Sequence, residues 1–399
     1  IIVEHDKEII KNADYIIDIG PKAGMNGGEV VYSGSFNSLE KHSLTLQYIK
    51  NLKSINKPYK IRKARNFIEI KGIEKNNLKN INTSIPIGIF TAVTGVSGSG
   101  KSTLIKDVFL AAIKRKLKDF SFKKPSCQSI EMPLYTEIEE IYFIDQNSIK
   151  KSSKSTAITY VNSFDNIRKL YASQEISKFK NYTSKNFSFN IPGGRCEHCK
   201  GQGYIIIEMQ FLADINLKCE VCDGKRYQEE ILKIKFKKMN IYDILNLTIE
   251  EGFNFFHKNN QNNISKNMEP LLSVGLGYLK MGQPINTLST GELQRLKLAS
   301  FLAKKNKQSI LIFDEPTKGL HFHDINILIR SFENLVENGN TVIVIEHNLD
   351  LIKNVDWIID MGPEGGEDGG KIIFSGPPHK LIEEKSHTGL ALKQEINQE

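Results

Sequence analysis

The chain has 399 residues, of which 40% are hydrophobic and 25% charged, and Lys and Arg outnumber Asp and Glu by 54 to 46. This length and balance predict two to three packed domains. The sequence shows neither a long apolar run nor a charged-then-apolar leader, so it indicates neither a membrane span nor export. We therefore expect a cytoplasmic protein. The net charge of +8 is spread along the chain and favours a polyanionic partner only weakly.

The start of the chain recurs near its end. Glu4 and His5 return as Glu346 and His347, and the same offset of 342 residues relates residues 13–21 to residues 355–363 without a gap. Repetition at fixed spacing indicates two homologous units. We therefore interpret residues 1–45 as the C-terminal remnant of a first unit, and the polar, lysine-rich residues 46–65 as a linker.

The second unit begins with an apolar alternation at residues 67–70 and reaches a glycine-rich loop at residues 95–102. The loop has the form G-x-x-x-x-G-K-S between a β-type run (89–94) and a helical segment (103–106), as a phosphate-binding loop requires. Lys101 would reach the β- and γ-phosphates, and the Ser102 hydroxyl would ligate Mg²⁺. The alternative, a flexible Gly-Ser loop, does not explain the flanking strand and helix. The candidate nucleotide-binding residues here are Gly95, Gly98, Ser99, Gly100, Lys101, Ser102 and Thr103.

A strand-like segment at residues 140–144 ends at Asp145 and Gln146, and Gln146 is a candidate catalytic residue or, alternatively, a surface amide. Residues 147–287 follow as an insertion with two Cys-x-x-Cys pairs separated by 19 residues. This spacing predicts tetrahedral Zn²⁺ with four thiolates, and a closed site of this kind is structural. Two disulfides or free thiols are the alternatives; His198 is expected not to be a ligand. The predicted zinc ligands are Cys196, Cys199, Cys219 and Cys222.

The insertion also interleaves basic and aromatic side chains. Such a set could bind phosphates and stack on or wedge between bases, although a solvated lysine-rich face has the same composition. The set consists of Lys150, Lys151, Lys154, Arg168, Lys169, Lys178, Lys180 and Lys185 with Tyr160, Phe164, Tyr171, Phe179 and Tyr182.

Three further motifs follow the insertion. Residues 288–295 (LSTGELQR) predict a helix capped by a serine, so that Ser289 and Gly291 could bind an anion at its start. The apolar run 309–313 leads to Asp314, expected to hold Mg²⁺ through water, and Glu315, expected to be the general base. His347 follows the strand-like residues 341–345 and would contact the γ-phosphate. Taken singly, the acid pair could be a helix cap and His347 a core histidine.

The five motifs in this order resemble those of ABC ATPases. The resemblance implies an α/β fold: a P-loop ATPase domain with a helical signature domain, here carrying an inserted zinc-binding module. It implies ATP hydrolysis at sites shared between two units, so that Ser289 would face the phosphates held by another unit. The expected domains are residues 1–45 (remnant of a first ABC unit), 46–65 (linker), 66–146 and 288–385 (second ABC unit), 147–287 (inserted signature domain) and 386–399 (tail).

Several shorter motifs resemble the UvrA family of repair ATPases over nearly the whole chain. They are residues 186–190 (NFSFN), 193–197 (GGRCE), 224–227 (GKRY), 274–278 (VGLGY), 282–284 (GQP) and 319–321 (GLH). The resemblance implies recognition of damaged duplex DNA in nucleotide excision repair, as part of an excision nuclease of the SOS response. It also implies a homodimer and hand-over of DNA to UvrB, whose binding region in the family lies in the first unit.

Three positions depart from that family. Thr290 replaces a glycine of the signature, Lys318 replaces a small polar residue after the carboxylates, and residues 147–154 differ from the family's run after the glutamine. A divergent relative that binds zinc and nucleotide without hydrolysis, as a DNA- or protein-binding scaffold, or a drug-resistance ATPase, therefore stays open as an alternative.

Overall fold

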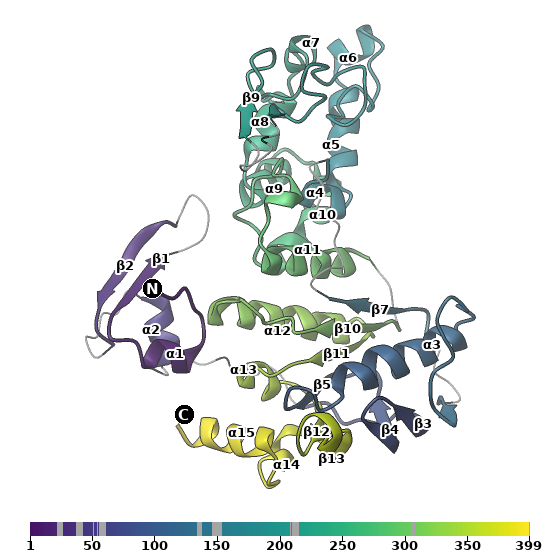
Figure 1. Ribbon diagram of the computed structural model, residues 1–399. Helices are drawn as coiled ribbons and strands as arrows, with labels where there is room; N and C mark the ends of the chain where they lie inside the picture. The colour runs from purple at the N-terminus through teal and green to yellow at the C-terminus, as the bar shows by residue number, and fades with distance from the viewer. Residues whose placement is uncertain are drawn as a thin grey trace. The chain divides into compact units, whose positions relative to one another are not determined.

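The computed structural model describes residues 1–21, 27–36, 43–50, 52–53, 55, 61–133, 138–145, 154–207, 209, 215–304 and 308–398. The chain forms two compact units, one from Ile1–Ser148 with Lys304–Glu399 and the other from Ile149–Ala303. Figure 1 shows the elements of each. No helix in the described ranges is long and apolar enough to cross a membrane.

A six-stranded sheet forms the centre of the first unit, in the order β13-β12-β5-β11-β10-β7. Only β13 runs antiparallel to its neighbour. The central strands are apolar throughout because both faces of a parallel sheet are covered, and every residue of β5 and β11 is buried. The strands are β5 (Phe90–Gly95), β7 (Ile141–Ile144), β10 (Ile310–Asp314), β11 (Thr341–Ile345), β12 (Trp357–Gly362) and β13 (Lys371–Gly376). The predicted mixed α/β sheet is confirmed.

Helices and a smaller antiparallel sheet complete this unit. The sheet has the order β4-β3-β6, and its Ile68 and Ile70 share one core with Phe109, Ile312 and Ile359. The helix after the glycine-rich loop begins as a π-helix, Thr103–Leu110, and continues as α3. The remaining bounds are β3 (Phe67–Lys75), β4 (Leu78–Pro86), β6 (Ser129–Glu131), α3 (Ala111–Lys116), α12 (Phe322–Glu337), α13 (Leu349–Ile352), α14 (Pro378–Leu381) and α15 (His387–Gln398).

The first residues of the chain form a small piece of structure that repeats the end of the chain. It consists of α1 (Lys7–Lys11), β1 (Ile16–Gly20), β2 (Glu29–Gly34) and α2 (Leu44–Ile49). β1 and β2 pair in the register of β12 and β13, and both hairpins have an irregularity at the same point, after Asp18 and after Asp360. The repeat in the sequence is therefore a repeat of structure.

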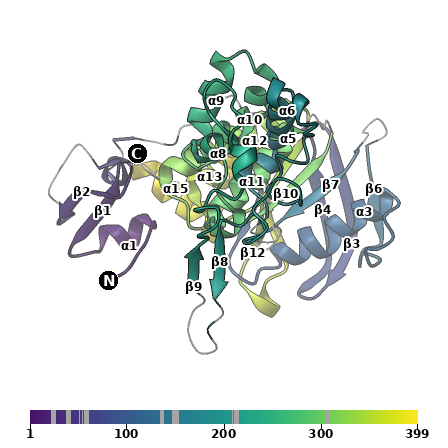
Figure 2. The same ribbon diagram turned by 90° about the horizontal axis from the view of Figure 1, so that it is seen from above.

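The second unit is mainly helical and carries one hairpin, β8–β9 (Figure 2). Reciprocal capping contacts begin α8 and α9, because Asn240 and Thr248 are each followed three residues later by an acid. The unit includes α11, which packs against α4 and α10, and so extends past the boundary predicted at residue 287. Its elements are α4 (Ala157–Tyr160), α5 (Ser163–Ala172), α6 (Glu175–Phe179), β8 (Tyr204–Ile207), β9 (Ile215–Lys218), α7 (Glu229–Leu232), α8 (Ile241–Asn246), α9 (Ile249–Lys258), α10 (Asn262–Ser273) and α11 (Thr290–Ala303).

Candidate nucleotide and metal sites

The glycine-rich loop leaves the carboxyl end of β5 and leads into the π-helix. Gly95 has φ +123°, and a Cβ there would lie 1.9 Å from the carbonyl oxygen of Met361, so the close approach of the two strands requires glycine. Lys101 is buried, and its Nζ donates to the carbonyl oxygens of Gly95 (2.9 Å) and Val96 (2.7 Å). The ammonium group therefore already lies inside the loop that would surround phosphates.

The acid pair follows the strand β10. Asp314 ends β10, opposite Ile345 of β11, and the next residue, Glu315, has the left-handed φ of +46° while its N–H donates to Ile345. Burial, together with the charge of Glu315, raises the pKa of the Asp314 carboxyl. A buried acid that is costly to ionise alone is the type of group that a divalent cation stabilises.

The charges of these groups act on one another because parallel strands deliver their carboxyl ends to one edge of the sheet. Burial lowers the pKa of Lys101, opposed by the negative charges of Glu315, Asp360 and Asp314. Partial burial and then the charge of Lys101 lower the pKa of His347, so its imidazole is neutral at pH 7. Lys101, Asp314, Glu315 and His347 thus belong to one electrostatic cluster.

Two positioning residues of this edge were not singled out from the sequence. The buried Glu346 accepts hydrogen bonds from the N–H of Thr317 (2.7 Å), His347 (2.8 Å) and Asn348 (3.1 Å), and so joins the loop after Glu315 to the loop of His347. Asn77 Nδ2 donates to the carbonyl oxygens of Gly98 (3.0 Å) and Gly366 (3.1 Å). The sequence feature that pointed to Glu346 is that the pair Glu4-His5 is repeated unchanged as Glu346-His347.

Lys318 contacts the candidate general base. Its Nζ lies 3.2 Å from Oε2 of Glu315, with both side chains well exposed. An exposed ion pair of this kind contributes about 0–1 kcal/mol. The contact therefore restrains the Glu315 carboxylate only weakly.

The signature residues lie in the second unit. Ser289 precedes α11, and its Oγ accepts from the N–H of Glu292 (3.3 Å), whose carboxylate accepts from the N–H of Ser289 (2.7 Å). Thr290 and Gly291 form the first turn of α11, where free N–H groups favour an anion. Gln146 lies outside the described residues.

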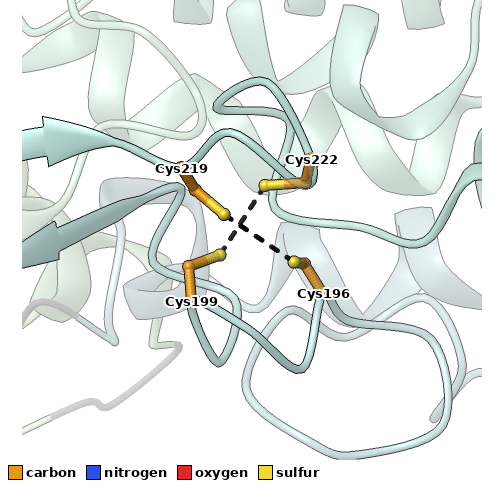
Figure 3. A group of neighbouring side chains, drawn as sticks. All are labelled: Cys196, Cys199, Cys219 and Cys222. Atoms are coloured by element: carbon orange, nitrogen blue, oxygen red, sulfur yellow. Dashed lines mark hydrogen bonds between the residues drawn. The ribbon is translucent and has the colours of Figure 1, made fainter.

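The four predicted zinc ligands converge on one point (Figure 3). All are buried, and their sulfur atoms lie within 4.8 Å of one another. The Sγ atoms of Cys196 and Cys219 are 4.0 Å apart, and those of Cys199 and Cys222 are 3.7 Å apart. Four sulfurs about 2.3 Å from a tetrahedral Zn²⁺ would be about 3.8 Å from each other, whereas a disulfide would need about 2.05 Å. The donor set fits zinc and not two disulfides.

Neighbouring groups act on the sulfurs unequally. Burial raises the pKa of Cys222 to about 12. At Cys219 burial is outweighed by hydrogen bonds from the Cys222 backbone and from His198, which lower its pKa to about 6. His198 Nδ1 lies 3.5 Å from the Cys219 sulfur, and the N–H of Gly203 donates to Cys199 (3.2 Å). His198 thus contacts a candidate ligand without joining the set of four.

The basic and aromatic set does not act as one surface. Phe164 and Tyr171 are buried on the inner face of α5, and the Tyr171 hydroxyl donates to the carbonyl oxygen of Met239 (2.8 Å). The expectation that these two rings could stack on bases is therefore wrong, because they belong to the core. Phe179 is 88% exposed and could stack. Lys180 forms an ion pair with Glu230, and Lys150 and Lys151 lie outside the described residues.

Comparison with known proteins identifies the relatives of this chain. The family model described as ABC transporter matches residues 78–318. UvrABC system protein A of Clostridium acetobutylicum is 47% identical over 399 residues, which cover 99% of this chain and 42% of that protein. The corresponding protein of Listeria innocua is 48% identical and is covered to 41%.

A solved structure agrees with these relatives. The crystal structure of UvrA2 from Deinococcus radiodurans superposes with a TM-score of 0.89 at 39% identity, covering 98% of this chain and 47% of that one. The resemblance to UvrA proteins found in the sequence is confirmed. The chain spans less than half the length of the curated relatives it matches.

Proposed function

Because this chain belongs to the ABC family and is similar to UvrA proteins over nearly its whole length, we propose that it binds and hydrolyses ATP in the recognition of damaged duplex DNA. The observation that carries the ATPase assignment is geometric: Lys101, Asp314, Glu315 and His347 lie at or just after the carboxyl ends of the neighbouring parallel strands β5, β10 and β11. The setting would be nucleotide excision repair in the cytoplasm.

Each residue of the cluster has a distinct role in this proposal. The loop N–H groups and Lys101 would hold the phosphates. Ser102 and Asp314 would hold Mg²⁺, which when bound would neutralise phosphate charge. Glu315 accepts the proton of the water that attacks the γ-phosphorus, while the bond to the ADP oxygen breaks. His347, neutral at pH 7, donates a hydrogen bond to the γ-phosphate. Gln146 is proposed to orient the same water.

ATP sites of this type are shared between two units. We propose that Ser289 and Gly291 at the start of α11 contact phosphates held by another ABC unit, from a longer chain or a second copy. The β-branched side chain of Thr290 leaves less room than a glycine would for a phosphate to reach the start of α11. A homodimer and transfer of DNA to UvrB are part of the same proposal, drawn from the family.

Zinc on Cys196, Cys199, Cys219 and Cys222 is proposed as a structural ion. The sulfur separations support it, and all four ligand positions are filled by protein, so no site remains for substrate. The zinc would fix the knuckles at the base of the β8–β9 hairpin. Elemental analysis should find about one zinc per chain, and Cys196→Ser should lower that content; a folded, metal-free protein would contradict the assignment.

Steady-state ATP turnover of the chain tests the enzymatic part, with and without lesion-bearing duplex. Lys101→Ala should abolish turnover, because nothing else described in the loop supplies a positive charge to the phosphates. Turnover that survives in Lys101→Ala would show that this loop is not the site. If the wild type has no turnover but binds nucleotide, addition of a full-length UvrA protein whose own phosphate-loop lysines are replaced should restore it.

The contact between Lys318 and Glu315 gives a finer test. Lys318→Thr frees the carboxylate, so we expect turnover to rise by at most about fivefold, the equivalent of a surface ion pair of about 1 kcal/mol. Lys318→Arg, which keeps the charge, serves as the control and should behave as the wild type. A fall in turnover in Lys318→Thr would show that the lysine assists the reaction instead.

A further inference from the structure

The second unit contains a pocket, lined in part by the short motifs at residues 224–227 and 282–284, that has no part in the candidate nucleotide and metal sites. It has a volume of about 300 Å³ and lies between the knuckle that follows Cys222 and the segment that ends at Thr287. Its polar side chains are those of Arg226, Lys280, Tyr242, Asn246, Gln283 and Thr287. No carboxylate is among the described residues that line it. Two positive charges therefore face one small volume with no negative charge beside them.

The two cations of the pocket have no acidic partner. Several other cationic side chains of the second unit do pair with acids: Arg168 with Asp165, Lys180 with Glu230, Arg195 with Glu197 and Lys218 with Asp223. In the described part of the chain neither Arg226 nor Lys280 has a carboxylate within ion-pair distance. A cation held away from acids in a concave site is the usual arrangement for binding an external anion.

The arginine is fixed in place before any ligand binds. Its Nη1 donates to the carbonyl oxygen of Gly282 (2.9 Å), and its guanidinium lies 5.4 Å from the ring centroid of Phe189. Because one edge of the guanidinium is held by the protein, its other N–H donors are presented at low entropic cost.

The neutral groups of the lining are similarly fixed. Gln283 Nε2 donates to Thr287 Oγ1 (3.1 Å), and Asn246 Nδ2 donates to the carbonyl oxygen of Tyr242 (3.1 Å). Each amide keeps a second N–H, and the Tyr242 hydroxyl is a further donor. The pocket thus combines two cations with fixed neutral donors, which matches the oxygens of a phosphate.

We propose that this pocket binds one phosphate of a nucleic-acid backbone, with Arg226 and Lys280 contacting its oxygens. The inference rests on the proposed function, in which the chain binds duplex DNA, and it adds a defined subsite. The pocket contacts the backbone and not a base edge, so it would contribute affinity and position without sequence preference.

The test measures duplex binding by fluorescence anisotropy at a series of salt concentrations, using the whole chain. Lys280→Ala should weaken binding about tenfold at low salt and reduce the slope of log affinity against log salt by about 0.9, the value for one lost phosphate contact. Lys280→Arg should restore both. Lys258→Ala, which removes an exposed lysine of α9 outside the pocket, is the matched control and should leave the slope unchanged.

Lys280 is exposed, so its variants should fold normally. If the slope of log affinity against log salt is the same for the wild type, Lys280→Ala and Lys258→Ala, and all three clearly bind DNA, the assignment of the pocket is overturned and the proposed function stays intact. Equal losses of DNA affinity in both alanine variants would also overturn the assignment, because the total charge and not the position of the lysine would then set the affinity.

A second measurement separates a failure of the pocket from a failure of the proposed function. The arginine Nε–H resonances of the wild type and of Lys280→Ala are followed by NMR while inorganic phosphate is added. If the wild type binds no duplex, the DNA part of the proposed function fails. A saturable phosphate shift of Arg226 in that case would assign the pocket to free phosphate and overturn its assignment to nucleic acid.

Discussion

The two β-hairpins at the ends of the chain have the same register and different surroundings. Ile17 and Ile19 of β1 are 62% and 67% exposed, whereas the equivalent residues of β12, Ile359 and Met361, are buried. The cause is the core packed against the sheet: Ile359 and Met361 share a core with the helix after the glycine-rich loop and with β3, whereas Ile17 and Ile19 belong to no core cluster in the described part of the chain. β12 also pairs in parallel with β5, while in the described part of the chain β1 pairs only with β2. The apolar pattern of a strand therefore predicts that other elements cover it, and burial depends on whether those elements are present.

The contacts that hold each hairpin also repeat in part. Thr388 Oγ1 donates to Asp360 (2.8 Å), and Thr45 Oγ1 donates to Asp18 (3.0 Å). Only the second threonine also contacts a histidine, His321, whose Nε2 is 3.0 Å away. Because the Thr45 proton is given to Asp18, Nε2 of His321 must be the donor of this bond. The first hairpin is thereby connected to the start of α12, close to the loop after Glu315.

The largest expected difference between the two copies is at the aspartate before each hairpin. Asp356 is buried and accepts from the N–H of Arg62 (2.8 Å), the guanidinium of Arg62 (3.1 Å) and the N–H of Phe90 (3.1 Å). Asp356→Ala removes three hydrogen bonds to a charged acceptor and leaves the N–H groups of Arg62 and Phe90 without it, while the Arg62 guanidinium keeps Glu333 (2.7 Å). We therefore expect a loss of about 3–5 kcal/mol in the free energy of unfolding. Asp14→Ala, at the exposed equivalent position, should change it by about 0.5 kcal/mol or less. Urea denaturation of both variants measures this, and equal effects would remove the contrast.

The next difference concerns the apolar residues themselves. Ile359→Ala should cost about 2–5 kcal/mol of unfolding free energy, because it removes buried methyl groups and leaves a cavity. Ile17→Ala should have an effect of about 0.5 kcal/mol or less in this chain. Thermal and urea unfolding provide the measurement. A cost above about 1.5 kcal/mol for Ile17→Ala would show that β1 is covered in solution, for example by a second copy.

The smallest expected effect is a pH dependence confined to the first copy. Burial lowers the pKa of His321, with Asp324 opposing it and His5 adding to it. A histidine whose folded-state pKa lies below its ordinary value near 6.5 takes up its proton more readily when unfolded, so its contribution to stability is lost as pH falls below about 6.5. Protonation of Nδ1 also ends its acceptance of the His323 N–H (3.2 Å).

Hydrogen exchange of α2 and α15 at pH 8 and pH 5.5, corrected for intrinsic rates, measures this effect. Protection in α2 should fall on acidification by the equivalent of about 1 kcal/mol, the usual size of one hydrogen bond, and protection in α15 should not. Thr45→Val removes the contact that connects His321 to α2, so the pH response of α2 should weaken, with Thr388→Val as the control in the other copy. An equal pH response of α2 and α15 would contradict this.

Most of the candidate nucleotide-binding edge was predictable because its determinants are local. The loop at residues 95–102, the run ending in Asp314 and the strand before His347 each combine an apolar strand with a functional group at its carboxyl end. The four cysteines were predictable for the same reason, since ligand spacing within each knuckle is a local property.

The predictions that failed depended on the orientation of side chains about a helix. Phe164 and Tyr171 were grouped with lysines as a surface, but they lie with Ile167 on one face of α5 at intervals of three and four residues. That helical period predicts a buried apolar stripe. The stripe is missed when residues are grouped by type without regard to their spacing. Glu346 was read only as part of a repeat because its partners Thr317 and Asn348 come from separate loops.

The sequence by itself determined the repeat, the order of the motifs and the cysteine cluster, because these follow from residue type and short spacing. The tertiary structure alone decided which copy of the hairpin is buried and that Arg226 and Lys280 share a pocket without an acid. Burial and charge pairing depend on groups far apart in the chain, so the free energy of each side chain is set by neighbours that local sequence does not specify.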